Sequence, residues 1–145
     1  MTYENKVLLL NGPNLNLLGG REPHIYGATK LQDIEQRLAT TASAVGSSLK
    51  AVQSNHEGTL IDEIHLAMNL NFNWIILNPG GFTHTSVALR DAVIASQIPM
   101  IEVHISQVFQ RESFRHHSYF SDIATARLVG FGTLGYDYAL AVALN

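Results

Sequence analysis

A tyrosine and an arginine stand five residues apart in a loop that follows a short apolar segment. Arg21 and Tyr26 come after residues 6–11, whose run of valine and leucine predicts a buried strand. A phenol ionises at a pKa of about 10, so it can act as a base only where the phenolate is stabilised. A nearby guanidinium favours the phenolate, and lowering the pKa by two units takes about 2.7 kcal/mol. The pair therefore predicts a proton-abstracting base.

The matching acid is predicted at the end of another apolar strand. Glu102 and His104 are two residues apart within residues 100–104, so their side chains point to the same face of that strand. A carboxylate beside an imidazole fixes its tautomer and favours its protonated form. A protonated, oriented histidine is a good general acid. Opposite pKa perturbations in one cleft mark an acid and a base.

Residues 78–84, with the sequence NPGGFTH, resemble a ligand cradle. Gly80 and Gly81 allow a close approach to the backbone. Thr83 or Thr85 is expected to cap the following helix, whose N-terminus would favour an anion.

Further residues with polar side chains or accessible backbone N–H groups follow the ends of the predicted strands. They are Asn14, Asn78, His84, Ile105, Ser106, Arg111 and Arg115. Residues 105–106 offer backbone N–H groups and a hydroxyl that suit a carboxylate. Because these residues gather at one edge of the predicted sheet, together they are stronger evidence for a ligand site than any one of them alone.

The elements that must position these side chains alternate along the chain. Strands are expected at residues 6–11, 49–54, 74–78, 100–104 and around 128–131. Helices are expected from Thr29 to Gly46, and at residues 58–71, 83–96 and 136–144, with a short helix within 105–125. The alternation predicts an α/β fold, a flavodoxin-like three-layer sandwich whose five parallel strands run in the order 2-1-3-4-5. Ligands in such sheets bind beyond the carboxyl ends of the strands.

Composition narrows the class of protein. We expect residues 1–145 to form one catalytic domain with a real core. The net charge of -3 gives no nucleic-acid footprint, and the lack of cysteine excludes disulfides and thiolate metal sites. No signal-type segment or membrane-length apolar run is found, so the chain is expected to be cytoplasmic. The low content of charged residues makes contacts between subunits plausible.

Two other motifs are set aside. His116 and His117 are adjacent, but no cysteine, aspartate cluster or HExxH motif accompanies them, so no metal is expected. Residues 130–135 read GFGTLG, which matches GxGxxG but follows the last strand instead of the first, so a dinucleotide is not expected.

At this point five motifs, in order, resemble the type II 3-dehydroquinate dehydratase family (type II dehydroquinases). They are NGPNLNLLG at 11–19 with Arg21 and Tyr26, QSNHEG at 53–58, NPG at 78–80 with His84, EVHIS at 102–106, and RE at 111–112 with FRHHS at 114–118. The resemblance covers nearly the whole chain.

The resemblance implies dehydration of 3-dehydroquinate to 3-dehydroshikimate, by anti elimination through an enolate and without a cofactor. Tyr26 would be the base and Arg21, on a closing loop, would stabilise its phenolate. Asn14 would stabilise the enolate, and His104, oriented by Glu102, would protonate the leaving hydroxyl. The substrate-binding positions would be Asn78, His84, Ile105, Ser106 and Arg115, with Asp91 reaching the substrate from a neighbouring subunit. The resemblance also implies a homododecamer built from trimers. It leaves open whether the enzyme serves shikimate biosynthesis or quinate breakdown.

Two other functions stay open on the residues alone. A non-catalytic flavodoxin-like module could bind a small anion or a partner protein with the same loops, without needing Tyr26 and His104 together. A metal-dependent hydrolase would lose activity with a chelator.

Overall fold

The computed structural model describes residues 4–20, 24 and 28–145, and five parallel strands form its single sheet. The strands are β1 (Lys6–Asn11), β2 (Ser48–Gln53), β3 (Trp74–Asn78), β4 (Met100–His104) and β5 (Ala126–Val129). Their order is β2-β1-β3-β4-β5, and every neighbouring pair is parallel. The expected sheet and its order are therefore confirmed. The bounds of β1, β3 and β4 match the predicted ones, whereas β2 begins one residue and β5 two residues earlier.

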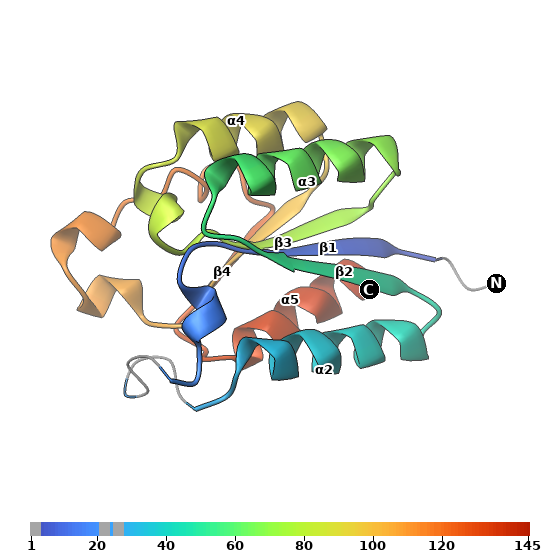
Figure 1. The fold of residues 1–145 in the computed structure, drawn as a ribbon, viewed down its shortest axis with the longest axis horizontal. Coiled ribbons are helices and arrows are strands. Elements are labelled where there is room, and N and C mark those ends of the chain that lie inside the picture. Colours follow the sequence, from blue (N-terminus) through green and yellow to red (C-terminus); the bar gives the residue numbers. More distant parts are fainter. Residues whose placement is uncertain (1–3, 21–23, 25–27) are drawn as a thin grey trace.

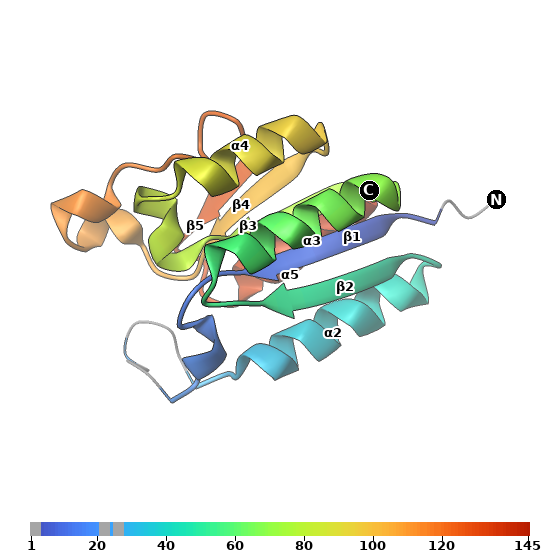
Figure 2. The same ribbon diagram turned by 45° about the horizontal axis from the view of Figure 1, so that its top comes forward.

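Helices cover both faces of the sheet (Figures 1 and 2). They are α2 (Leu31–Ala44), α3 (Glu57–Asn69), α4 (Val87–Ser96) and α5 (Leu134–Leu144). Helices α3 and α4 lie on one face, and α2 and α5 lie on the other. Short 3-10 helices η1 (Leu15–Leu17), η2 (Gly80–His84), η3 (Val108–Gln110) and η4 (Ser113–Arg115) lie in the loops that follow β1, β3 and β4.

The core lies in two layers because successive strand side chains face opposite ways. In β1, Val7 and Leu9 pack towards α2 and α5, whereas Leu8 and Leu10 pack towards α3 and α4. All four are fully buried, as expected for a strand in the middle of a parallel sheet. Within the described residues, no helix is both long and apolar enough to cross a membrane.

Two helices, α2 and α4, begin later in the chain than expected. Helix α2 begins after Lys30, whose backbone N–H donates to the Asp33 carboxylate at 3.2 Å, instead of at Thr29. Helix α4 begins after Ser86, whose hydroxyl accepts from the Leu89 N–H, because η2 takes up the residues expected to form its first turn. Thr83 and Thr85 therefore do not cap it.

Smaller differences concern single residues. Gly46 ends α2 as expected, with a positive φ of 76°. The residues expected to form a short helix after β4 form η3 and η4 instead.

The carboxyl ends of β1 and β3 meet in close contact. The Gly12 N–H donates to the Asn78 carbonyl at 2.8 Å, and a Cβ at Gly12 would lie 2.1 Å from the Pro79 carbonyl oxygen. Gly80 has a positive φ of 59° and turns the chain beside Pro13. These contacts seat the two loops that follow β1 and β3 against each other.

Candidate active site

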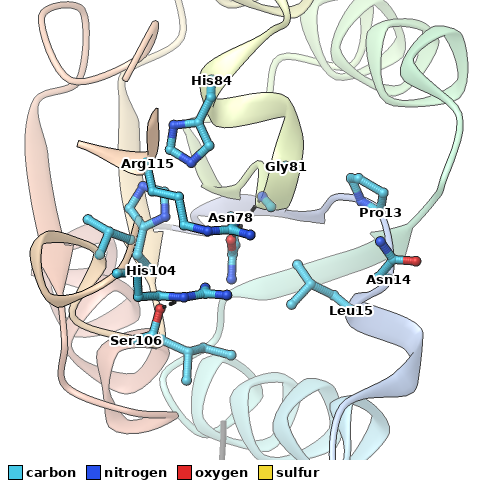
Figure 3. Close-up of a pocket in the computed structure, with 13 residues that line it drawn as sticks. Pro13, Asn14, Leu15, Asn78, Gly81, His84, His104, Ser106 and Arg115 are labelled. Carbon is cyan, nitrogen blue, oxygen red and sulfur yellow. Dashed lines mark hydrogen bonds between the residues drawn. The ribbon is translucent and has the colours of Figure 1, made fainter. Parts of the chain in front are cut away.

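A cavity of about 160 Å³ opens at the carboxyl edge of the sheet (Figure 3). Asn78 lies at its centre, with Pro13, Asn14 and Leu15 on one side and His84 and Arg115 on the other. The full lining is Pro13, Asn14, Leu15, Asn78, Gly80, Gly81, His84, His104, Ile105, Ser106, Val108, Arg111 and Arg115. Three strand ends therefore contribute to one cavity, as expected for a doubly wound sheet.

A charged cluster underlies the β4 side of this cavity. We define it as Glu102, His104, Ser118, Ser121 and Arg127. Glu102 Oε2 accepts from His104 Nε2 at 2.5 Å and from the Ser118 hydroxyl at 2.7 Å. Its other oxygen accepts from the Ser121 hydroxyl at 2.7 Å and lies 3.3 Å from Arg127 Nε, an ion-pair contact. The buried carboxylate is thus surrounded by donors, which is the condition for burying a charge.

These partners decide the ionisation of Glu102. Burial alone raises the pKa of its carboxyl, but the hydrogen bonds from His104, Ser121 and Ser118 outweigh burial and hold that pKa below its ordinary value. Because the carboxylate only accepts, His104 Nε2 carries a proton. His104 Nδ1 is then the ring nitrogen available to the cavity, and it can donate a proton only when the ring is an imidazolium.

His84 is oriented by the loop on the far side of the cavity. Its Nδ1 donates to the His117 carbonyl oxygen at 2.6 Å, which fixes the tautomer. Burial lowers the pKa of the His84 imidazole, and the positive charges of His104 and Arg115 also lower it. In the neutral ring Nε2 is an acceptor, suited to a ligand hydroxyl.

Two arginines lie on the rim that η3 and η4 form. Arg111 Nη1 donates to the Ser106 hydroxyl at 3.3 Å. Arg115 Nε donates to Glu112 at 3.0 Å, and its guanidinium lies 5.0 Å from the Phe114 ring centroid. With both guanidinium groups in the lining, the cavity suits a negatively charged ligand.

Asn14 is held by its backbone. It adopts a left-handed conformation with φ of 68°, and its N–H donates to Asn55 Oδ1 at 3.0 Å. Gln53 in turn donates to Asn55 and to the Gly12 carbonyl oxygen, both at 3.1 Å. The loop after β2 therefore fixes where the loop after β1 begins.

A neutral cluster lies where β1 and β3 end, and we define it as Asn11, Asn78 and Tyr136. The Tyr136 hydroxyl donates to Asn11 Oδ1 at 2.6 Å and accepts from Asn78 Nδ2 at 2.8 Å. Asn78 Oδ1 accepts from the Gly80 N–H at 3.1 Å. Asn78 therefore reaches the cavity with both ends of its carboxamide already engaged.

The structure brings most of the predicted residues together, with three exceptions. Asn14, Asn78, His84, His104, Ile105, Ser106 and Arg115 line the cavity, and Glu102 supports His104. Arg21 and Tyr26 lie outside the described residues. Asp91 is exposed on α4 and is not part of the lining.

Sequence reasoning missed several contributors. Pro13, Leu15 and Val108 line the cavity, and Ser121, Arg127 and Tyr136 support it from outside. The sequence shows a tyrosine at position 136, but nothing near it in the sequence indicates its contact with Asn11, which is 125 residues away. No group of three or more His, Cys, Asp or Glu in the described part of the chain could hold a metal ion.

Comparison with known proteins gives one consistent result. The family model described as Dehydroquinase class II matches residues 5–144. The catabolic 3-dehydroquinase of Emericella nidulans is 57% identical over 143 residues, which cover 98% of this chain and 93% of that protein. The 3-dehydroquinate dehydratase of Actinobacillus pleuropneumoniae serotype 5b is 59% identical over 140 residues, covering 97% of this chain and 90% of that protein.

Solved structures agree with the sequence comparisons. The crystal structure of type II dehydroquinase from Butyrivibrio crossotus superposes with a TM-score of 0.94 at 40% identity, covering 98% of this chain and 99% of the other. That from Propionibacterium acnes gives a TM-score of 0.92 at 37% identity and covers both chains fully.

Proposed function

The chain belongs to the class II dehydroquinase family and is a type II 3-dehydroquinate dehydratase, and from that premise we propose that Tyr26 and His104 carry out its elimination. Tyr26, as the phenolate, takes the proton beside the ketone and gives an enolate. The enolate then expels the hydroxyl group as His104 donates a proton to it, so the products are 3-dehydroshikimate and water. The cycle closes when the proton on Tyr26 returns to His104 through solvent.

The observation that carries this proposal is the pairing of His104 with buried Glu102 at the cavity wall. The contact holds His104 Nε2 at 2.5 Å from a carboxylate whose pKa is lowered by its hydrogen bonds despite burial. The carboxylate orients the His104 ring, and the imidazolium is the form that can donate from Nδ1. In this proposal His104 is therefore the acid, with Glu102 as its positioning residue.

The base side rests on the sequence resemblance and on how its loop is anchored. Leu15, Leu18 and Leu31 pack in one core cluster, which joins the segment after β1 to the start of α2. Gly19 approaches Ala28 so closely that a Cβ there would lie 2.9 Å from the Ala28 carbonyl oxygen. The described residues that flank the segment, Gly19 and Ala28, therefore lie close together, and Leu15 of the same core cluster lines the cavity. In the proposal Arg21 stabilises the Tyr26 phenolate and Asn14 stabilises the enolate.

Substrate binding is assigned to the remaining lining residues. Arg115 and the backbone and hydroxyl groups of Ile105 and Ser106 suit the carboxylate of 3-dehydroquinate. Neutral His84 and the Asn78 carboxamide suit its hydroxyl groups. The mechanism needs no metal or nucleotide, because the phenolate, the enolate stabiliser and the imidazolium together supply the base, the oxyanion binding and the acid.

Asp91 is proposed to reach the active site of a neighbouring subunit. Val87 and Ile94, one turn to either side of Asp91 on α4, are 50% and 49% exposed, so Asp91 lies within an uncovered apolar stripe. An interface on this stripe fits a homododecamer built from trimers. Light scattering of the protein in solution measures the mass and tests this part.

Relatives named as catabolic enzymes and relatives named simply 3-dehydroquinate dehydratase are both close to this chain. The reaction is the same in quinate breakdown and in shikimate biosynthesis. The proposed chemistry therefore does not depend on the pathway.

The decisive experiment replaces Tyr26 with phenylalanine and follows the ultraviolet absorbance of the conjugated product after 3-dehydroquinate is added. We expect kcat to fall by about 10³-fold or more, with substrate binding largely kept, because the base is removed and the ring is not. Tyr138→Phe, on exposed α5 surface, is the matched control and should keep full activity. A Tyr26→Phe protein that retains most of kcat would show that another group is the base.

A further inference from the structure

The hydroxyl of Tyr136 is the only polar atom of a side chain that otherwise fills the core. Tyr136 is fully buried in the layer between the sheet and helices α2 and α5. A phenylalanine would provide the same apolar contacts without burying a hydroxyl, which costs free energy unless it is hydrogen-bonded. The hydroxyl here joins α5 to the ends of both β1 and β3.

The direction of these hydrogen bonds is determined. Burial raises the pKa of the Tyr136 phenol far above its ordinary value, so the group keeps its proton. That proton goes to Asn11 Oδ1, and the hydroxyl oxygen is left to accept from Asn78 Nδ2. Tyr136 is therefore an acceptor towards Asn78.

The same contacts fix the orientation of the Asn78 carboxamide. With the amide as it stands, Nδ2 donates to Tyr136 and Oδ1 accepts from the Gly80 N–H at 3.1 Å. Turning the amide over would place its oxygen against the Tyr136 oxygen and its NH₂ against the Gly80 N–H. Both hydrogen bonds would be lost and replaced by repulsive contacts, so the flipped amide is strongly disfavoured.

The arrangement is not one that stability alone would favour. Asn11 is fully buried, and its Nδ2 has no hydrogen-bond partner among the described residues. A buried unpaired donor costs about 1–3 kcal/mol. Among the described residues, the buried Asn11 amide is therefore hydrogen-bonded only through Oδ1, which accepts from the Tyr136 hydroxyl.

We propose that Tyr136 is a positioning residue of the active site, which acts by fixing the direction in which Asn78 presents its carboxamide to the substrate. Asn78 has one Nδ2 hydrogen and one Oδ1 lone pair left after its contacts with Tyr136 and Gly80. These are the groups left to bind a ligand in the cavity that Asn78 lines. The inference rests on the proposed role of Asn78 in substrate binding.

The test is a double-mutant cycle of Tyr136→Phe and Asn78→Ala, read as KM and kcat for 3-dehydroquinate. Tyr136→Phe should raise KM about 3- to 10-fold and change kcat less than about twofold, because a binding contact is misoriented and the acid and base are untouched. In the Asn78→Ala background the same Tyr136→Phe change should alter KM less than about twofold, since the group that Tyr136 orients is gone. Tyr138→Phe, on the same helix, should leave both constants unchanged.

Each other outcome overturns a defined statement. Equal effects of Tyr136→Phe on KM in both backgrounds, or no effect in the native one, would show that Tyr136 serves the core only. No effect of Asn78→Ala on KM or kcat would remove Asn78 from the proposed substrate site, and the role of Tyr136 with it.

A second variant guards against misfolding of Tyr136→Phe. Asn11→Ala removes the acceptor of the Tyr136 proton, so the hydroxyl is free to donate to Asn78. The flipped amide is then opposed only at the Gly80 N–H and becomes less disfavoured. KM should rise about 2- to 5-fold although Asn11 is not part of the cavity lining. An unchanged KM in a folded Asn11→Ala protein would contradict the proposal.

Discussion

The charged cluster around Glu102 and the neutral cluster around Tyr136 each reach the cavity through one side chain, but they are assembled differently. Four of the five members of the charged cluster bind a single carboxylate, and all five come from residues 102–127. The neutral cluster joins β1, β3 and α5, and its hydroxyl lies 58 and 125 residues from its two partners. The charged cluster places the Glu102 carboxylate behind His104, whereas the neutral cluster fixes the orientation of the Asn78 carboxamide.

This difference has a physical origin. A proton donor needs a nearby fixed charge, which is stable in a core only when several hydrogen bonds surround it. A binding amide needs no charge but needs a defined orientation, which two neutral hydrogen bonds provide. We therefore expect damage to the charged cluster to lower kcat and to change how stability depends on pH on the acid side. Damage to the neutral cluster should raise KM and change how stability depends on pH on the alkaline side.

The largest expected effect comes from His104→Asn. The substitution keeps a polar side chain but removes the proposed acid, so kcat should fall about 10²- to 10⁴-fold with little change in KM. Steady-state kinetics with 3-dehydroquinate measures both constants. The matched control is His65→Asn on the exposed side of α3, which should keep native values. A large rise in KM with kcat preserved would place His104 with the binding residues instead.

Glu102→Gln should have the next largest effect, and it concerns stability. The pKa of Glu102 is lowered in the folded protein, so the carboxylate stabilises the fold above its unfolded pKa and this contribution is lost as pH falls through the folded pKa. Because glutamine keeps the shape but not the charge, we expect a loss of about 2 kcal/mol at neutral pH.

Urea unfolding at a series of pH values measures this effect. The difference between native and Glu102→Gln proteins should shrink as the pH is lowered below about 4.5, the ordinary pKa of a glutamate. A difference that stays constant from neutral to acid pH would mean that the charge of Glu102 does not stabilise the fold.

Tyr136→Phe should have the smallest effect on stability, at the opposite end of the pH range. The pKa of Tyr136 is raised in the folded protein by burial, so its contribution is complete below the ordinary value of 10.0 and is lost as pH rises towards the folded pKa. Unfolding measured between about pH 9 and pH 11 should show a weaker alkaline loss in Tyr136→Phe than in the native protein. An identical alkaline slope would argue against burial of an ionisable hydroxyl there.

The sequence predicted elements whose pattern is local and missed those decided by contacts. Strands β1, β3 and β4 are apolar runs with clear ends, and their bounds were correct. Strand β5 was placed too late, because Phe131 prolongs the apolar run in the sequence whereas Gly130, with φ of 85°, already lies outside the strand. The start of α4 was misplaced since η2 and Ser86 compete with Thr83 for the same turn.

The same distinction holds in the active site. The contact between Glu102 and His104 follows from the two-residue period of a strand, and the structure contains it. Their roles, like those of Arg21 and Tyr26, stay predictions until the variants are measured. Ser121, Arg127 and Tyr136 could not be assigned from sequence, because their partners are distant in the chain and no periodicity relates them.

The contact at Gly12 has a consequence for the position of Asn78 in the cavity. With a Cβ at this position only 2.1 Å from the Pro79 carbonyl oxygen, even alanine would wedge the ends of β1 and β3 apart. This separation would also move Asn11 away from Asn78, and the Tyr136 hydroxyl needs both residues close together for its two hydrogen bonds. The shape of the cavity around Asn78 therefore depends on the absence of a side chain at Gly12 as well as on the side chains that line the cavity.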